Sequence, residues 1–493
     1  MTTFRVLALA MAGTLLAACA VPGRIRQPEG MRSDVPLAGL TSAKATGKWP
    51  DPRWWKRYHD TQLNQLIDSA LKGATSLATA RSRVQEATAA AKVTADQVGL
   101  RINGNAQFTR QRLSENGLIP TSVLGFTWYN QGDLGIQGSY DFDLWGGHRA
   151  AVQAAIGQIR AAQAGRSAAA LALEVQITRT YFGWLADQQR LELARMAVQQ
   201  QEKLAHVLDL RVMAGIDPSD HWQQARSAAA ASRQKLEALR GSARIRQAVL
   251  AALVGVSPKD LPRLKPRPLP KAHASVPAHA RLDLVARRPD IAARRWQVEA
   301  ALRRTDVARA KFFPDLSINA LAGFSSIDLG KLTAPASRVF SVTPALHLPI
   351  FESGLLHAAY GLSRAQLETA VAQYNDAVIN AARQVATQVL DLERLRAQSA
   401  QQQQQLQAVA SLERSASARR RQGVTNIVPL LQARLQLLTQ RDALLQLHAQ
   451  TLDADIGLIQ ALGGGYRMHG NPSADAATPA PASSSSSLRK PRS

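Results

Sequence analysis

The residues that could perform chemistry are few in this 493-residue chain. Its single cysteine, Cys19, excludes internal disulfides and zinc sites that need two or more sulfurs. His206 and His221 lack a partner at metal-ligand spacing, and His273 and His279 lie in a proline-rich segment. The sequence has neither a phosphate-binding loop nor a nucleophile elbow. We therefore expect no catalytic residues, no metal site and no cofactor, and predict that the protein is not an enzyme.

Cys19 ends an N-terminal export signal. Arg5 precedes an apolar run over 6–18, which is too short to span a bilayer as a mature helix. The residues Leu16-Ala17-Ala18-Cys19 resemble a bacterial lipobox, in which small residues precede a cysteine that receives lipid. The resemblance implies a signal peptide over 1–18 and lipidation of Cys19. Because Ala20 stands in place of the aspartate that retains many such lipoproteins at the inner membrane, the resemblance implies that the lipoprotein goes to the outer membrane of a Gram-negative bacterium. The alternative is an ordinary signal with an incidental cysteine.

The composition limits the class of protein. Hydrophobic residues make up 46% of the chain, which is too polar for a bundle of transmembrane helices and too apolar for a disordered chain. The net charge of +24 could suit nucleic acid, but Lys and Arg are spread over the chain without a recognition motif. An exported protein also meets little nucleic acid. We therefore predict no nucleic-acid partner.

The chain contains an internal repeat, which decides the organisation before any local motif does. Asp143-Leu144-Trp145-Gly146-Gly147 matches Pro349-Ile350-Phe351-Glu352-Ser353, and Ala214-Gly215 matches Gln422-Gly423. Between the halves lies a proline-rich stretch that supports neither helix nor central strand. We predict a lipidated N-terminal segment over 19–61, repeat 1 over 62–255, a linker over 256–280, repeat 2 over 281–465 and a disordered tail over 466–493.

Each repeat is predicted to be mainly helical. Repeat 1 has a helical pattern over 62–99, a long proline-free helix over 147–213 and a return helix over 218–254. Repeat 2 opens with a helix and has the corresponding long helix over 354–421 and return helix over 427–462. At a rise of 1.5 Å per residue, each long helix could reach roughly 100 Å. Their apolar seams are typical of coiled coils and run along Leu171, Val175, Thr178 and Leu185, and along Val378, Val385, Val389 and Leu392.

Between these helices the hydrophobic period changes to two, which predicts β-hairpins at about 101–143 and about 315–349. The polar residues occupy odd positions: Asn103, Asn105, Gln137, Ser139, Asp141, Ser317, Asn319, Ser341 and Thr343. Apolar residues occupy even positions: Phe108, Ile136, Tyr140, Phe142, Ile318, Phe340 and Val342. Such alternation suits a transmembrane barrel whose lumen is wet, although a soluble sheet would alternate in the same way. We expect the odd positions to face water inside a barrel and the even positions to face lipid.

The doubled order of helix, two strands, long helix, turn and return helix resembles the outer membrane efflux family of TolC-like channels, most closely its lipidated NodT-type branch. The resemblance covers about residues 50–465. It rests on Tyr140-Asp141-Phe142-Asp143-Leu144-Trp145-Gly146, Ala286-Arg287-Arg288-Pro289-Asp290-Ile291, Phe312-Phe313-Pro314-Asp315-Leu316, Leu348-Pro349-Ile350-Phe351-Glu352-Ser353-Gly354 and the two glycine turns.

The resemblance implies a homotrimer. Four strands per chain would close one barrel in the outer membrane, and the helices would continue it as a helical barrel through the periplasm. A periplasmic adaptor and an inner-membrane pump, of the RND type, would load this passive channel. Outer-membrane lipid would surround the barrel.

The resemblance also places the two glycine turns at a periplasmic aperture that an adaptor dilates. The residues expected at this tip are Gly215, Asp217, Asp220, Arg420, Arg421, Gly423 and Gln432. Many family members carry an acidic ring six and nine residues after the turn glycine. This chain has Pro429 and Gln432 there in the second turn, so cation binding is not carried over.

The basic run Arg419-Arg420-Arg421 at the second turn has two interpretations. It could be a solvated face near a helix end, where cations interact favourably with the helix dipole. Alternatively, Arg420 or Arg421 pairs with Asp217 or Asp220 of the adjoining repeat and holds the aperture shut.

The predicted fold is therefore mainly α with transmembrane β, and the predicted function is the outer-membrane channel of a tripartite efflux system. The rival hypothesis is a lipid-anchored periplasmic coiled-coil scaffold without a pore, in which the alternating segments form a small soluble sheet.

Overall fold

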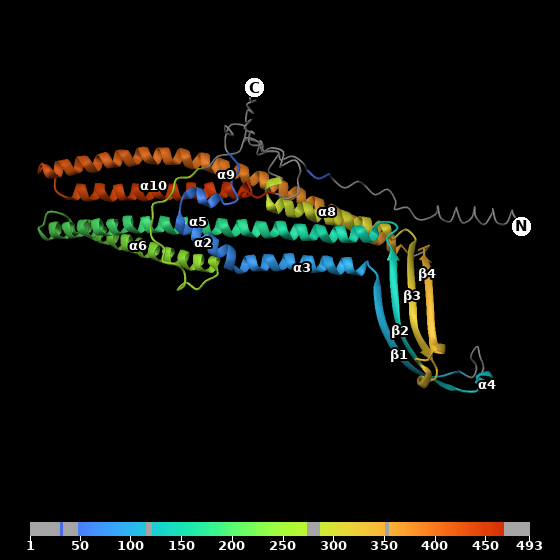
Figure 1. The fold of residues 1–493 in the computed structure, drawn as a ribbon. Helices are drawn as coiled ribbons and strands as arrows, with labels where there is room; N and C mark the ends of the chain where they lie inside the picture. The colour runs from blue at the N-terminus through green and yellow to red at the C-terminus, as the bar shows by residue number, and fades with distance from the viewer. Residues whose placement is uncertain (1–29, 33–47, 115–120, 274–285, 351–353, 468–493) are drawn as a thin grey trace, which may run out of the picture.

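The structure is a computed structural model that describes residues 30–32, 48–114, 121–273, 286–350 and 354–467. The molecule is elongated: a long helical bundle carries, at one end, a four-stranded sheet turned at an angle to the helices (Figure 1). Cys19, the expected signal peptide and most of the expected tail lie outside the described residues. None of the described helices is long and apolar enough to cross a membrane.

Two antiparallel pairs of helices form the bundle. In repeat 1, α5 (Gly147–Met213) is followed by α6 (Ser219–Val254), and in repeat 2, α9 (Leu355–Arg421) is followed by α10 (Val428–Ala461). The shorter helices that pack on α5 or α9 are α2 (Thr61–Gly73), α3 (Thr75–Gln97) and α8 (Pro289–Ala310). Of the eight expected seam residues, all except the half-buried Leu171 are buried, as helices packed side by side require.

The four strands form one antiparallel sheet in the order β1-β2-β3-β4. Repeat 1 contributes β1 (Arg101–Arg112) and β2 (Trp128–Phe142), and repeat 2 contributes β3 (Asp315–Ser326) and β4 (Arg338–His347). The four-residue helix α4 (Thr121–Leu124) lies in the first hairpin. Pairing of β2 with β3 joins the two repeats. The expectation of a mainly helical chain with four strands is confirmed.

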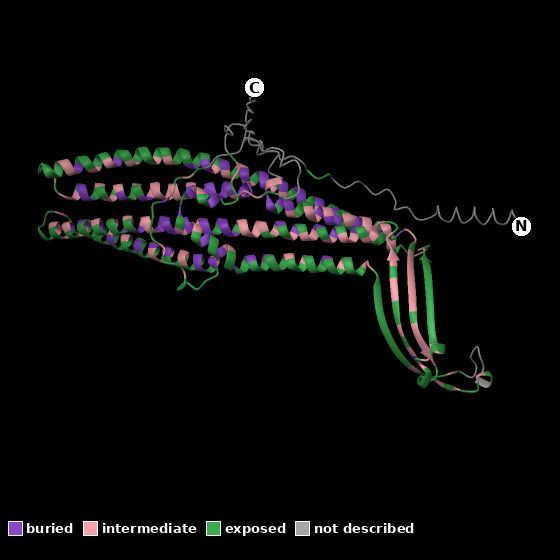
Figure 2. Cartoon of the chain, in the orientation of Figure 1, coloured by how far each residue is buried: buried purple, intermediate pink, exposed green. Residues whose placement is uncertain are grey.

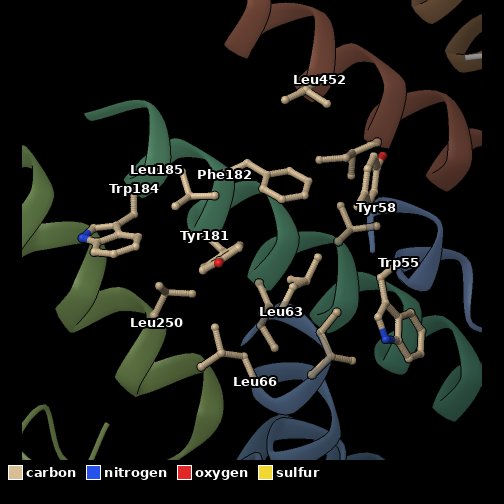
Figure 3. Packing of buried hydrophobic residues seen from close by; sticks show 14 of the residues in the cluster. Trp55, Tyr58, Leu63, Leu66, Tyr181, Phe182, Trp184, Leu185, Leu250 and Leu452 are labelled. Atoms are coloured by element: carbon tan, nitrogen blue, oxygen red, sulfur yellow. The ribbon is translucent and has the colours of Figure 1, made fainter. Parts of the chain in front are cut away.

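The apolar core lies in the middle of the bundle and not in the sheet. Figure 3 shows aromatic residues of α5, among them Tyr181, Phe182 and Trp184, packed between Leu63 of α2, Leu250 of α6 and residues further along the chain. Figure 2 shows buried residues concentrated along the helices, while the strands are half-buried or exposed. The sheet of one copy therefore has almost no core of its own.

The structure differs from the expected single helix at the start of repeat 1. The helical pattern over 62–99 is not one helix, because Ala74 adopts an extended conformation and separates α2 from α3. The break lies where the end of α2 meets the end of α6: a Cβ on Gly255 would approach the Gly73 carbonyl oxygen to 2.9 Å. The described end of the expected lipidated segment over 19–61 includes the 3-10 helix η2 (Trp54–Tyr58), whose two tryptophans are buried.

The described part of the proline-rich linker, 256–273, runs across the bundle without helix or strand. Its carbonyl groups accept hydrogen bonds from side chains of the helices, including Gln62 Nε2 to Lys265 O at 3.0 Å and Gln189 Nε2 to Arg267 O at 3.2 Å. Its Leu269 is buried. The linker is thus fastened to the bundle through its backbone, which satisfies polar groups that a strand ladder would otherwise pair.

A buried carboxyl group links η2 to α5. Glu174 accepts a hydrogen bond from Trp54 Nε1 at 3.1 Å, and only 8% of Glu174 is exposed. Burial raises the pKa of Glu174 to about 7, against the smaller lowering effect of the Trp54 hydrogen bond. The folded chain therefore favours the protonated form of this group more than the unfolded chain does.

We expect Glu174→Gln to stabilise the protein at pH 8 and to have little effect at pH 5. The glutamine keeps an oxygen for Trp54 but cannot ionise, whereas Glu174 loses stabilisation as pH rises through its folded pKa. The shift to about 7 corresponds to roughly 3 kcal/mol as an upper limit. Denaturant unfolding at both pH values measures the effect. Glu192→Gln, on the exposed side of α5, is the control, and a gain independent of pH would contradict this account.

Candidate functional site

The register of the sheet brings all nine expected polar positions onto one face. Residues that oppose each other directly in an antiparallel ladder point to the same side of the sheet. Asn103 opposes Gln137, which lies in one row with Leu321 and Ser341. The other rows of this face follow the same odd numbering, with Ser139 opposite Asn319, Asn319 opposite Thr343, Asp141 opposite Ser317, and Asn105 opposite Gly135.

Further polar residues lie on this face. Arg101 forms an ion pair with Asp141, with 3.0 Å between Nη2 and Oδ2. Asp133 accepts hydrogen bonds from Ser325 Oγ at 2.7 Å and from Gln131 Nε2 at 3.1 Å. Sequence reasoning missed Arg101, Asp133 and Ser325, although their odd numbers already placed them in the polar series. Leu321 is an apolar exception in the same series.

The opposite face is apolar and lies open in a single chain. All seven expected apolar residues have even numbers and therefore lie on it, and Phe340 and Val342 are 74% and 72% exposed. Further exposed apolar residues of this face lie on β1, β2 and β4: Ile102, Trp128, Leu134 and Leu346. A continuous apolar surface of this kind needs a lipid or protein partner, because water would oppose its exposure.

The sheet is also incomplete at its edges. In the described chain β1 pairs only with β2, and β4 pairs only with β3, so each has one unpaired side. Unpaired edges present rows of N–H and C=O groups that must find partners away from water. In lipid, this sheet would need further strands beside β1 and β4.

The two glycine turns lie together at the end of the bundle opposite the sheet (Figure 1). Gly215 and Gly423 have φ values of 67° and 74°, in the left-handed region that glycine adopts without strain. After each glycine the next amide N–H turns back to the helix: Ile216 donates to Arg211 O and Val424 donates to Arg419 O. Both turns thus close their long helices with the same Schellman-type arrangement.

The charges at the turns do not form the expected latch within the chain. Asp217 accepts hydrogen bonds from Arg211 Nε at 2.6 Å and Nη2 at 2.8 Å, and this pairing lowers the pKa of the Asp217 carboxyl group. Asp220 accepts the His221 amide N–H. In the single chain the Asp217 carboxylate is held by the end of its own helix, and the pairing of Arg420 or Arg421 with Asp217 or Asp220 of an adjoining repeat stays a hypothesis.

The remaining tip residues are exposed. Arg420 and Arg421 lie in the last turn of α9, and Gln432 lies on the outside of α10. Arg211 was missed in the sequence because its partner lies six residues away, across a turn, outside the three- and four-residue spacings that helix pairs use. In the described part of the chain, no three His, Cys, Asp or Glu side chains gather as a metal site.

Comparison with known proteins adds to this geometry. The family model of outer membrane efflux proteins matches residues 66–256 and 282–464. The multidrug resistance outer membrane protein MdtP of Escherichia coli is 32% identical over 463 residues, which cover 92% of this chain and 95% of that protein. The crystal structure of VceC of Vibrio cholerae has a TM-score of 0.77 and 30% identity, covering 85% of this chain and 100% of VceC. The Campylobacter jejuni CmeC outer membrane channel shares the fold, with a TM-score of 0.81 at 22% identity, covering 93% of this chain and 98% of CmeC.

Proposed function

Since the chain belongs to the outer membrane efflux protein family, we propose that three copies of it form the channel of a tripartite efflux system. It is an outer-membrane efflux protein of a family of channels, not of enzymes. In the proposed system the channel conducts substrates passively to the cell exterior from an inner-membrane pump, of the RND type, and a periplasmic adaptor. The observation that carries the proposal is a four-stranded sheet with one polar face, one apolar face and two open edges.

The open edges support assembly from several copies. Four strands are too few to enclose a lumen, because an eight-stranded barrel is only just wide enough for its own side chains. When β4 of one copy pairs with β1 of the next, three copies close a barrel without edges. The nine polar residues that include Gln137 and Asn319 then line its water-filled lumen.

The helices support the same assembly. On α6, residues such as Ala225, Ala229 and Leu236 are buried against α5. Several exposed residues along α6 are small or apolar: Ala228, Ala231, Ala238, Ile245 and Val249. These exposed residues suit close contact with a helix of the neighbouring copy, so that the helices continue the barrel as a tunnel.

We place the aperture and the adaptor contact at the two glycine turns. They lie farthest from the sheet, and they combine exposed cations such as Arg420 and Arg421 with exposed apolar residues such as Ile216 and Val424. These groups give an adaptor both charge and apolar area to bind. Gly215, Asp217, Asp220, Gly423 and Gln432 complete the proposed tip.

Planar-bilayer recording tests the proposed channel. The purified full-length protein should run as a heat-resistant trimer in detergent and should give ion conductance in a planar bilayer. A water-filled lumen conducts ions passively, whereas a periplasmic scaffold without a pore would give none. Monomers without conductance would therefore favour the scaffold and overturn the proposal.

We expect Cys19→Ser to abolish acylation of the chain. The thiol of Cys19 is the proposed attachment point of the lipid, and several acyl chains together give a stable anchor. Radioactive palmitate should label the wild-type protein in cells and leave the variant unlabelled. Equal labelling of both would contradict the anchor without affecting the channel.

Ile136→Asp should hinder membrane assembly far more than Gln137→Asp. Ile136 lies in the middle of the apolar face, where a charge in lipid costs roughly 2 kcal/mol, while the neighbouring Gln137 points to the polar face. The fraction of heat-resistant trimer in isolated outer membranes measures the difference. If the two variants assemble equally well, the assignment of faces is wrong.

A further inference from the structure

The apolar face of the sheet ends in arginines at the end remote from the helices. Arg110 opposes Asn130, Arg112 opposes Trp128, and Arg338 opposes Phe324. All three arginines have even numbers, so they lie on the apolar face and not on the polar face. We call Arg110, Arg112, Arg338 and Trp128 the distal rim.

Aromatic and cationic groups meet in the distal rim. The guanidinium of Arg110 lies over the Trp128 ring, 5.6 Å from its centroid, and Trp128 is 55% exposed. Tryptophan is enriched where a membrane meets water, and arginine there keeps its charge at the headgroups while its stem covers apolar surface. The rim therefore has the composition of a membrane boundary.

The length of the apolar face agrees with this position. On β2 the apolar face runs from Phe142 to Gly132, which opposes Phe108. The ten steps from residue to residue extend about 33 Å along a strand, and the tilt usual in barrels reduces this to about 25 Å across the membrane. That is the height of the apolar band in outer-membrane barrels. Arg110 follows Phe108 on the same face and so falls at the headgroups.

The cations occur at one end of this face only. At the helix-side end the rows are apolar, with Phe142 opposite Leu316 and Leu316 opposite Leu346. Arg101, the strand arginine at that end, belongs to the polar face and pairs with Asp141. Within the four strands, the apolar face thus carries arginines at its distal end alone, which suits an anionic partner there.

We propose that the distal rim binds the phosphate groups of the glycolipid of the outer leaflet. This inference rests on the proposed function, which places the distal end of the barrel at the cell exterior. Arginine suits phosphate because its planar guanidinium donates two parallel hydrogen bonds. Arg338 begins β4 and Arg110 lies near the end of β1, so in a closed ring these residues of adjacent copies flank one headgroup at each junction.

Lipid titration of the full-length trimer tests the rim. Bisphosphorylated lipid A is added to the detergent-purified protein, and bound lipid is counted by native mass spectrometry. Arg110→Gln with Arg338→Gln should weaken binding at least about tenfold, because charge-assisted hydrogen bonds to phosphate are lost. Arg110→Lys with Arg338→Lys keeps both charges and should retain most of the binding.

A matched control removes the same charge elsewhere. Arg226 stacks over Trp222 at 5.6 Å, as Arg110 does over Trp128, and Arg83 is exposed on α3. Arg226→Gln with Arg83→Gln should bind lipid A as the wild type does. Equal weakening by this control would show a general effect of net charge and overturn the proposal.

Two competing lipids complete the test. Dephosphorylated lipid A should bind poorly, and phosphatidylglycerol should displace lipid A only at about tenfold higher concentration, because it offers one phosphate instead of two. Equal binding of either lipid would overturn the proposal. Conductance is recorded on the same preparations. A conducting trimer that does not bind lipid A would refute only the proposal that the distal rim binds lipid. Absence of conductance would refute the proposed channel function.

Discussion

The structure depends on the need of every backbone N–H and C=O group in lipid for a hydrogen-bond partner. A four-stranded sheet with an apolar face cannot meet this need alone, because β1 and β4 each keep one open side. An edge in hydrocarbon costs several kcal/mol per unpaired group, far more than a single side-chain contact returns. The sheet therefore demands neighbours, and the helices that enter and leave it must hold its strands at the angle that lets neighbours close.

The apolar core in the middle of the helical bundle holds the helices that carry the sheet. Tyr181 and Trp184 of α5 lie in the main core cluster. Asp442 of α10 ties the two halves together by accepting hydrogen bonds from Arg190 at 2.7 Å and Lys235 at 2.8 Å. Burial alone would raise the pKa of Asp442, but these two cations outweigh it and leave the pKa below its usual value. Towards the turns the described core shrinks to a small cluster around Leu204 and Leu431, so packing there is weaker.

The sequence predicted the fold well because its main signals are periodic. Long runs without proline and a strict two-residue alternation are local properties, and the register follows them across all four strands, as in the row of Asn103, Gln137 and Ser341. What escaped prediction depends on contacts between distant segments. The break at Ala74 arises where Gly73 meets Gly255. The sequence around either glycine does not indicate that the two residues come into contact.

In the candidate site, too, periodic features could be predicted from the sequence and contacts between particular residues could not. The odd numbering placed nine polar residues on one face, and the same rule would have added Arg101 and Asp133. The partner of Asp217 did not follow from any rule of spacing, because the turn after Gly215 folds the chain back onto Arg211. Periodicity therefore assigns a residue to a face, whereas its partner depends on the local path of the chain.

The pairing of Arg211 with Asp217 makes the two turns electrically unequal. The first turn neutralises its own arginine and keeps Asp220 exposed, while the second turn presents Arg419, Arg420 and Arg421. Around the proposed ring of three copies, turns that expose Asp220 would alternate with turns that expose Arg419, Arg420 and Arg421. A partner protein that surrounds this ring would find two inequivalent binding sites on every copy. The difference in charge between the two sites could set the orientation of the partner and the number of partner copies that bind.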